Sequence, residues 1–225
     1  MSDESVPPCR PPADLAELEV RAAALAGGAL SELQARSAVR FSASMVRRKG
    51  KAGQLVERLL GASAGSLAVP DFPELGVELK TLPIDAQGRP TESTFVCTLS
   101  LADADRMEWS DSPVRAKLAH VLWVPILVGD EPRIGTPFFW KPTAEQEDVL
   151  KGDFEEIVGM VAIGNVEGLT AHVGRWLQAR PKAAHGGVRT RAYGADDEPL
   201  SILPRGFYLR ARFTRELLRE RRRLW

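Results

Sequence analysis

The feature of this sequence that most constrains its fold is a set of short apolar runs of strand length, separated by segments with helical patterns. In the run 75–82, LGVELKTL, Val77 and Leu79 alternate with Glu78 and Lys80, as in a strand with one buried face. Three further runs are apolar almost throughout, which is typical of strands inside a sheet: 93–101, 120–128 and 136–140. Strands with helices between them predict a mixed α/β fold.

Helical patterns fill the segments around these runs. Thr143 and Gln146 predict a capping box at the start of one helix, and Thr214 is the expected cap of a basic terminal helix. Further strands are expected within 176–182 and 202–213, and a polar, glycine-rich loop over 185–199. The expected helices are 13–30, 31–39, 53–60, 144–164 and 166–176. We expect a flexible tail over residues 1–12 and a single domain with two sub-lobes over residues 13–225.

Composition excludes several classes of protein. No apolar run approaches the roughly 20 residues of a membrane-spanning helix, and the N-terminus lacks the apolar core of a signal peptide. Two cysteines, Cys9 and Cys97, do not make a disulfide framework. The sequence therefore predicts a reduced, cytoplasmic protein.

The net charge is zero, with 30 basic and 30 acidic residues, but the basic residues are clustered. Basic patches lie within 40–58, 180–191 and 205–225. A neutral chain with segregated basic patches can bind a phosphate backbone, although each patch alone also fits a solvated helix face.

Three charged side chains around the run 75–82 suggest a chemistry. Glu78 and Lys80 share one face of the expected strand, about 6.5–7 Å apart along the backbone. Asp71 lies upstream, in a turn-rich stretch that is able to fold back towards Glu78. Converging carboxylates repel each other unless a cation lies between them, and oxygen ligands favour Mg²⁺ over zinc. A lysine beside such an ion can position or deprotonate the attacking water in phosphodiester cleavage, or neutralise charge on the phosphorane.

Glu57, on the preceding expected helix, is the expected third carboxylate, either as a metal ligand or as a group that orients the lysine. The three histidines are scattered without ligand spacing, which argues against a zinc site. Asp/Glu/Lys patterns also arise by chance in charged chains. An exposed Glu78–Lys80 surface pair without a catalytic role is therefore the alternative interpretation.

Several segments, in order along the chain, resemble the MutH family, the methyl-directed endonucleases of DNA mismatch repair. They are GQLVERLLGASAGS, PDFPELGVELKTLPID, GRPTESTFVC, VRAKLAHVLWVPI, LQARPKAA and LPRGFYLRARFT, and they span roughly residues 20–218. The family is similar in its core to type II restriction enzymes of the PD-(D/E)xK group. The resemblance implies a restriction-endonuclease-like mixed sheet flanked by helices, with two lobes around a DNA-binding cleft.

Carried over position by position, the resemblance implies that Asp71 and Glu78 ligate the metal together with the carbonyl of Leu79. Glu57 would complete the acidic cluster, and Lys80 would be the catalytic lysine. Mg²⁺ is the expected ion, and Mn²⁺ or Ca²⁺ would also occupy the site.

The resemblance also implies a set of DNA contacts. Lys117 would lie near the scissile phosphate. The other implied contacts are Lys49, Gly50, Arg180, Pro181, Lys182, Arg205, Gly206 and Tyr208. An arginine can read guanine O6 and N7, and an aromatic ring can sense a methyl group on adenine N6. Taken singly, Tyr208 also fits a half-buried core ring, and the lysines fit ordinary surface positions.

The activity that the resemblance implies is nicking of the unmethylated strand at a hemimethylated GATC site in double-stranded DNA, stimulated by the MutL-type mismatch-repair ATPase. We expect a monomer. A restriction enzyme that cuts both strands would share every site residue, and a non-catalytic DNA-binding module is a further alternative.

Overall fold

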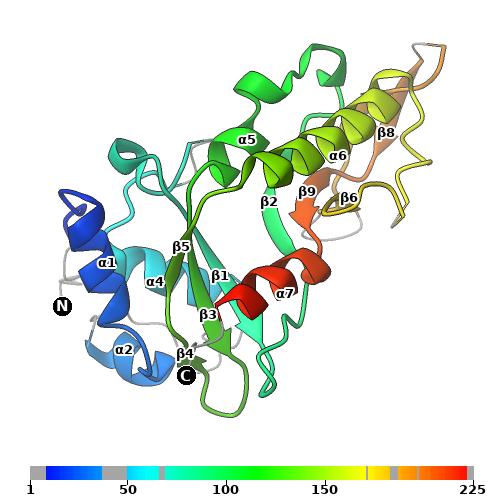
Figure 1. Cartoon of the computed structure of the whole chain (residues 1–225). Coiled ribbons are helices and arrows are strands. Elements are labelled where there is room, and N and C mark those ends of the chain that lie inside the picture. Colours follow the sequence, from blue (N-terminus) through cyan, green and yellow to red (C-terminus); the bar gives the residue numbers. More distant parts are fainter. Residues whose placement is uncertain are drawn as a thin grey trace, which may run out of the picture. The chain divides into compact units, whose positions relative to one another are not determined.

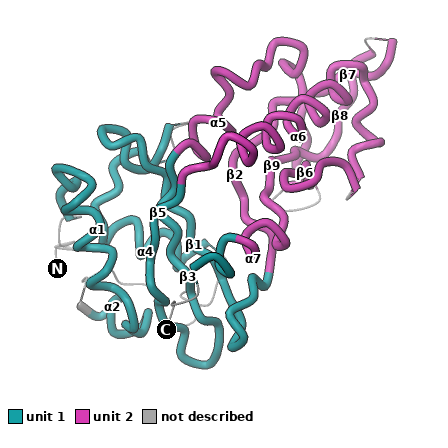
Figure 2. Tube along the Cα trace, in the orientation of Figure 1, with its two compact units in different colours: residues 1–91, 120–140, 217–225 teal, residues 92–119, 141–216 magenta. Residues whose placement is uncertain are grey.

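The computed structural model describes residues 9–36, 50–65, 69–170, 172–182, 187–196 and 198–221. The chain divides into two compact units (Figure 2). Unit 1 comprises residues 1–91, 120–140 and 217–225, and unit 2 comprises residues 92–119 and 141–216. Among the helices in the described ranges, none is both long enough and apolar enough to cross a membrane.

Unit 1 is built on a four-stranded mixed sheet. β1 (Glu78–Ile84) pairs in parallel with β3 (Val121–Leu127), which pairs antiparallel with β4 (Arg133–Ile134) and β5 (Phe138–Trp140). β3 therefore lies between β1 and the two shorter strands (Figure 1). This central position explains its apolar sequence, because every residue of β3 except the last is buried.

Three helices accompany this sheet: α1 (Leu15–Ala23), α2 (Leu30–Arg36) and α4 (Lys51–Leu60). The expected helix 13–30 is thus wrong in extent, because α1 ends before Gly27, whose φ is +77°. The helix expected over 53–60 is confirmed as α4, which ends at Gly61 with φ +81°. Apolar faces of the helices and the sheet form one core cluster: Leu18, Ala22, Leu25, Leu30, Leu33, Leu55, Val56, Leu60, Phe72, Val77, Leu79, Leu122, Val124, Ile126 and Ile134.

Unit 2 contains a three-stranded antiparallel sheet in the order β2 (Thr94–Leu99), β9 (Arg205–Leu209) and β6 (Leu177–Pro181). A separate hairpin pairs β7 (Thr190–Tyr193) with β8 (Pro199–Ile202). The expectation of a polar, glycine-rich loop over 185–199 is therefore wrong for the strand residues, since cross-strand hydrogen bonds outweigh the local turn composition.

The longest helix of unit 2, α6 (Ala144–Ala162), packs against β6 (Figure 1). Its predicted capping box at Thr143 and Gln146 is confirmed. The ring of Phe154 stacks on Phe207 of β9 with the centroids 5.6 Å apart. α6 therefore contributes to the core on the side of the sheet that carries Phe207.

The remaining elements are short helices, and the residues of one of them, α7, are divided between unit 2 and unit 1. They are η1 (Pro73–Leu75), η2 (Ala104–Arg106), η3 (Trp109–Asp111), α5 (Pro113–Leu118) and α7 (Ala211–Glu220). The expected cap at Thr214 is wrong, because α7 begins three residues earlier and the Thr214 hydroxyl donates to the carbonyl of Ala211 inside the first turn.

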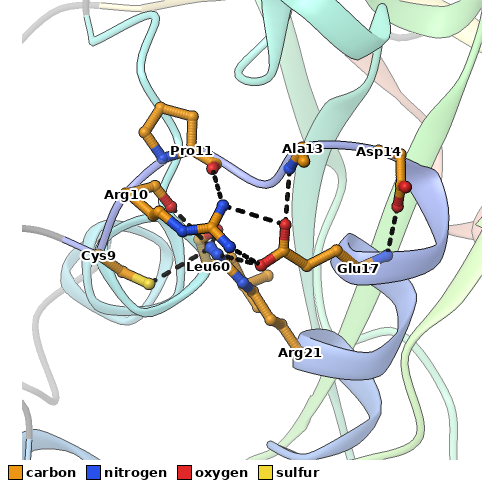
Figure 3. A network of polar contacts seen from close by, with 8 residues as sticks. All are labelled: Cys9, Arg10, Pro11, Ala13, Asp14, Glu17, Arg21 and Leu60. Atoms are coloured by element: carbon orange, nitrogen blue, oxygen red, sulfur yellow. Dashed lines mark hydrogen bonds and ion pairs between the residues drawn. The ribbon is translucent and has the colours of Figure 1, made fainter.

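A polar network ties residues 9–13 to α1 and to the end of α4 (Figure 3). Glu17 accepts hydrogen bonds from Arg10, at 2.6 and 3.1 Å, and from Arg21 at 2.7 Å. Arg21 also donates to the carbonyl oxygen of Leu60, in the last turn of α4, at 3.1 Å. The start of the described chain is thereby attached to the helix that carries Glu57.

This network predicts a pH-dependent contribution to stability. The pKa of Glu17 is lowered from 4.5 to about 2, first by the hydrogen bond from the Ala13 N–H and then by Arg21 and Arg10. Because the folded pKa is below the unfolded one, the stabilisation is complete above about pH 4.5 and is lost as the pH falls towards 2. We expect Glu17→Gln to lower the urea midpoint of unfolding at pH 7, and the two midpoints to converge between pH 4.5 and 2. A difference at pH 2 as large as the difference at pH 7 would contradict this origin.

Candidate active site and DNA-contacting face

A tight turn brings Asp71 to the beginning of β1. Phe72 and Val77 form an antiparallel bridge, with N···O distances of 2.9 and 3.2 Å, and η1 lies between them. Residues 71 and 78 flank this bridge on opposite strands. The Asp71 Oδ2 atom accepts the backbone N–H of Leu79 at 2.8 Å. The turn therefore places the Asp71 carboxylate beside the backbone of β1, as the sequence predicted for a chain that folds back towards Glu78.

Glu78 and Lys80 form a buried ion pair on one face of β1. The Lys80 Nζ atom lies 2.5 Å from Glu78 Oε1, and only 10% of the lysine side chain and 3% of the glutamate side chain are exposed. Burying two charges carries a desolvation cost that an exposed surface pair does not have. The alternative interpretation of an exposed Glu–Lys surface pair is therefore wrong.

Glu57 approaches β1 from α4. A Cβ placed on Gly53, one turn earlier, would lie 3.6 Å from Thr81 Oγ1 and 3.8 Å from Glu57 Oε1. By strand alternation, Thr81 belongs to the face of β1 opposite to that of Glu78 and Lys80. The structure thus places the Glu57 carboxylate beside Gly53 on α4, the helix that packs against β1.

The donor chemistry of this region fits a hard divalent cation. Among the residues that the structure describes, no group of three or more His, Cys, Asp or Glu side chains is arranged to hold a metal ion. Mg²⁺ commonly takes only one or two carboxylates from the protein and completes its shell with waters and substrate phosphate. Asp71 and Glu78, held near each other by the turn, supply such a pair.

In unit 2, one face of the β2–β9–β6 sheet gathers aromatic rings and basic side chains. Tyr208 pairs with Phe95 on one side and with Gln178 on the other, so these three side chains share a face. The rings of Phe95 and Tyr208 are 5.3 Å apart at 64°. Arg180 Cζ lies 6.0 Å from the Tyr208 ring centroid, and Lys182 Nζ lies 3.4 Å from that of Phe95. We call the face formed by Phe95, Gln178, Arg180, Lys182, Gly206 and Tyr208 the aromatic–basic face.

Gly206 has a steric role on this face. A Cβ at this position would lie 2.8 Å from Phe95 Cε2 and 3.0 Å from the carbonyl oxygen of Cys97. The absence of a side chain at residue 206 therefore lets the Phe95 ring lie over the backbone of β9.

Pro181 and Arg205 pair with each other and belong to the opposite face of the sheet. The guanidinium of Arg205 donates to the carbonyl oxygen of Leu169 at 3.1 Å, and burial lowers its pKa. The structure therefore separates these two residues from Arg180, Lys182 and the other side chains of the aromatic–basic face.

The remaining predicted residues lie elsewhere. Gly50 is the N-cap of α4 in unit 1, with φ +89°, and Lys117 lies half-buried on α5 in unit 2. Lys49 lies outside the described residues.

Phe95 was missed at the sequence level, where the run 93–101 indicated only a buried strand. Only the pairing of β2 with β9 shows that the Phe95 ring is half-buried and lies beside Tyr208, while both of its neighbours in the strand are buried. In the sequence, the one available signal for this position was a large aromatic residue within an apolar run.

A mixed α/β fold that presents a buried acid and lysine on a strand, with a second acid beside them, defines a restriction-endonuclease-like nuclease. A family model described as DNA mismatch repair enzyme MutH matches residues 60–153. The DNA mismatch repair protein MutH of Yersinia enterocolitica is 45% identical over 223 residues, which cover 97% of this chain and 97% of that protein. The MutH protein of Serratia proteamaculans is 46% identical over 213 residues, covering 92% and 93%.

The chain belongs to the MutH family. This membership confirms the expected family, the restriction-endonuclease-like α/β fold and the activity class: the protein is a DNA endonuclease of mismatch repair.

Proposed function

We propose that this endonuclease nicks the unmethylated strand of double-stranded DNA at hemimethylated GATC sites, with Mg²⁺ as its cofactor and with stimulation by the MutL-type mismatch-repair ATPase. The observation that carries the proposal is the buried Glu78–Lys80 pair with Asp71 beside it, in a chain of the MutH family. We further propose that the protein acts as a monomer in the cytoplasm.

Asp71, Glu78 and the carbonyl of Leu79 would hold the ion, with Glu57 as the further acid, and Mn²⁺ or Ca²⁺ would bind the same oxygen ligands. When bound, the ion supplies Lewis-acid polarisation of the phosphate and a bound water of lowered pKa. Lys80 contributes an ammonium group that positions the attacking water or neutralises charge that develops on the phosphate.

DNA recognition would involve both units. Arg180 would read a guanine, and Tyr208 would sense the methylation state of the adenine, because both side chains lie on the aromatic–basic face. Lys117 would act near the scissile phosphate. The further proposed DNA contacts are Lys49, Gly50, Pro181, Lys182, Arg205 and Gly206.

The decisive test compares cleavage of unmethylated, hemimethylated and fully methylated GATC duplexes, with and without Mg²⁺ and with and without the MutL-type ATPase. We expect strand-specific nicks in the hemimethylated duplex that require the ion, that increase with the ATPase and that are absent when both strands are methylated. Cutting of both strands regardless of methylation and of the ATPase would identify a restriction enzyme instead.

Lys182 offers a quantitative test of the aromatic–basic face. Each phosphate contact contributes a slope of about −0.9 to a plot of log affinity against log salt concentration. We therefore expect Lys182→Ala to weaken DNA binding and to reduce the slope by about 0.9, because one counterion fewer is released. Lys151→Ala, which removes an exposed lysine paired with Glu155 on α6, is the control and should leave the slope unchanged. Equal slopes for Lys182→Ala and the unaltered protein would exclude a phosphate contact by Lys182.

A further inference from the structure

Asp153 on α6 uses its buried carboxylate to hold three successive backbone N–H groups in unit 2. Only 6% of the residue is exposed. Oδ1 accepts the N–H of Arg175 at 2.6 Å, and Oδ2 accepts those of Trp176 and Leu177 at 2.6 and 2.8 Å. Hydrogen bonds from backbone N–H groups to an ionised carboxylate are short and strong. The expected helix over 166–176 is wrong, in part because these donors are turned towards α6.

The same turn is held through its carbonyl groups by the start of α7 and the residue before it. Arg212 donates from Nε to the carbonyl oxygen of Arg175 at 2.6 Å. Arg210 donates from its backbone N–H to the carbonyl of Trp176 at 2.8 Å and from its guanidinium to that of Val173 at 2.5 Å. Residues 173–177 are therefore clamped from both sides, with Asp153 on the donor side.

This turn leads directly into β6. Leu177 is the first residue of β6, and Arg180 and Lys182 follow three and five residues later. β6 is an edge strand with β9 as its strand partner in the described sheet. Because β9 pairs with β6 along one edge only, the clamp at Leu177 adds a second constraint on where β6 begins, and therefore on where its two cations lie.

We propose that Asp153 is a positioning residue for DNA binding: by clamping residues 175–177 it sets the direction of β6 and thereby places Arg180 and Lys182 on the aromatic–basic face. The inference rests on the proposed DNA contacts of these two cations. Asp153 itself is buried on α6, on the opposite side of the sheet from the aromatic–basic face, so its effect on DNA binding would pass through these two cations.

A double-mutant cycle separates this role from a purely structural one. The four proteins are the unaltered chain, Asp153→Asn, Arg180→Ala/Lys182→Ala, and the triple variant. Affinity for a hemimethylated GATC duplex and the thermal midpoint are measured for each. We expect the Arg180→Ala/Lys182→Ala pair to weaken binding by about tenfold or more, since it removes two cations. Asp153→Asn should weaken binding by about three- to tenfold alone but by less than about twofold in the triple variant, because it acts through the cations already removed.

The thermal midpoint should fall by the same amount in both backgrounds, since the loss of the clamp itself does not depend on the cations. Glu155→Gln, an exposed acid on the same helix, should change neither quantity. If Asp153→Asn does not fold, Arg212→Gln enters the same cycle, because it removes the hydrogen bond to the Arg175 carbonyl from an exposed position. Losses of affinity that multiply independently in the triple variant would overturn the positioning role. An Arg180→Ala/Lys182→Ala protein that binds DNA normally would instead overturn the proposed DNA face.

Discussion

Asp71→Asn is expected to reduce the single-turnover rate of DNA cleavage by about a thousandfold while leaving the fold intact. The amide oxygen of asparagine can still accept the N–H of Leu79, which is now held at 2.8 Å, so the turn before β1 keeps its hydrogen bond. The negative charge that we propose for binding the metal is lost. Removal of one preorganised electrostatic group costs about 10²–10³ in rate, and the loss of a metal ligand falls at the upper end of that range. The measurement uses a hemimethylated GATC duplex at saturating protein concentration.

Asp85→Asn provides a matched control. Asp85 follows the other end of β1, and its carboxylate also accepts backbone N–H groups, those of Gln87 and Arg89, at 2.9 Å each. The same chemical change at this position should leave the cleavage rate within about twofold of the original, because the partly exposed Asp85 lies beyond the far end of β1 from Glu78 and a surface change of this kind alters stability little. If Asp71→Asn cleaves as fast as Asp85→Asn, the active site has been misplaced.

The second large effect concerns stability. Lys80→Met should lower the free energy of unfolding by about 3–5 kcal/mol, because it leaves the Glu78 carboxylate buried without its cation. The double variant Glu78→Gln/Lys80→Met removes both charges. It should regain most of that loss, since replacement of a buried ion pair by neutral side chains is often neutral or stabilising.

Both variants should be inactive in cleavage. The double variant should therefore be stable but inactive, which distinguishes the effect on stability from the effect on activity. Urea unfolding at neutral pH gives the free energies, and the GATC duplex assay gives the activity. A double variant as unstable as Lys80→Met would show that the pair contributes to stability through its packing and not through compensated charge. Cleavage by either variant would contradict the role assigned to the lysine.

The strand that carries Glu78 and Lys80 was predictable from the sequence because the pattern that indicates it involves only residues close together in the chain. The alternation of Val77, Glu78, Leu79 and Lys80 determines which side chains share a face, whatever the strand pairs with. The turn before it is local as well, since Phe72 and Val77 are close enough in sequence for the pattern to predict that Asp71 folds back. The capping box at Thr143 was predictable for the same reason.

The proposed DNA contacts were predictable only as a list of residues, and their arrangement on the sheet was not. Alternation places Arg205 and Gly206 on opposite faces of β9, but only the structure shows that Arg205 is engaged with the carbonyl of Leu169. Phe95 joins the aromatic–basic face only because β2 pairs with β9 in one particular register. A shift of that register by one residue would place Phe95 on the other face.

By itself, the sequence determined the mixed α/β fold, the strand that carries Glu78 and Lys80, and the family to which the chain belongs, because these depend on local periodicity and on ordered motifs. Tertiary structure alone decided that this ion pair is buried, that the helix carrying Glu57 packs against β1, and that residues 175–177 form a clamped turn and not a helix. The physical reason is the range of the interactions. Asp153 meets these donors across more than twenty positions of the chain, and contacts over such separations leave no periodic pattern in the sequence.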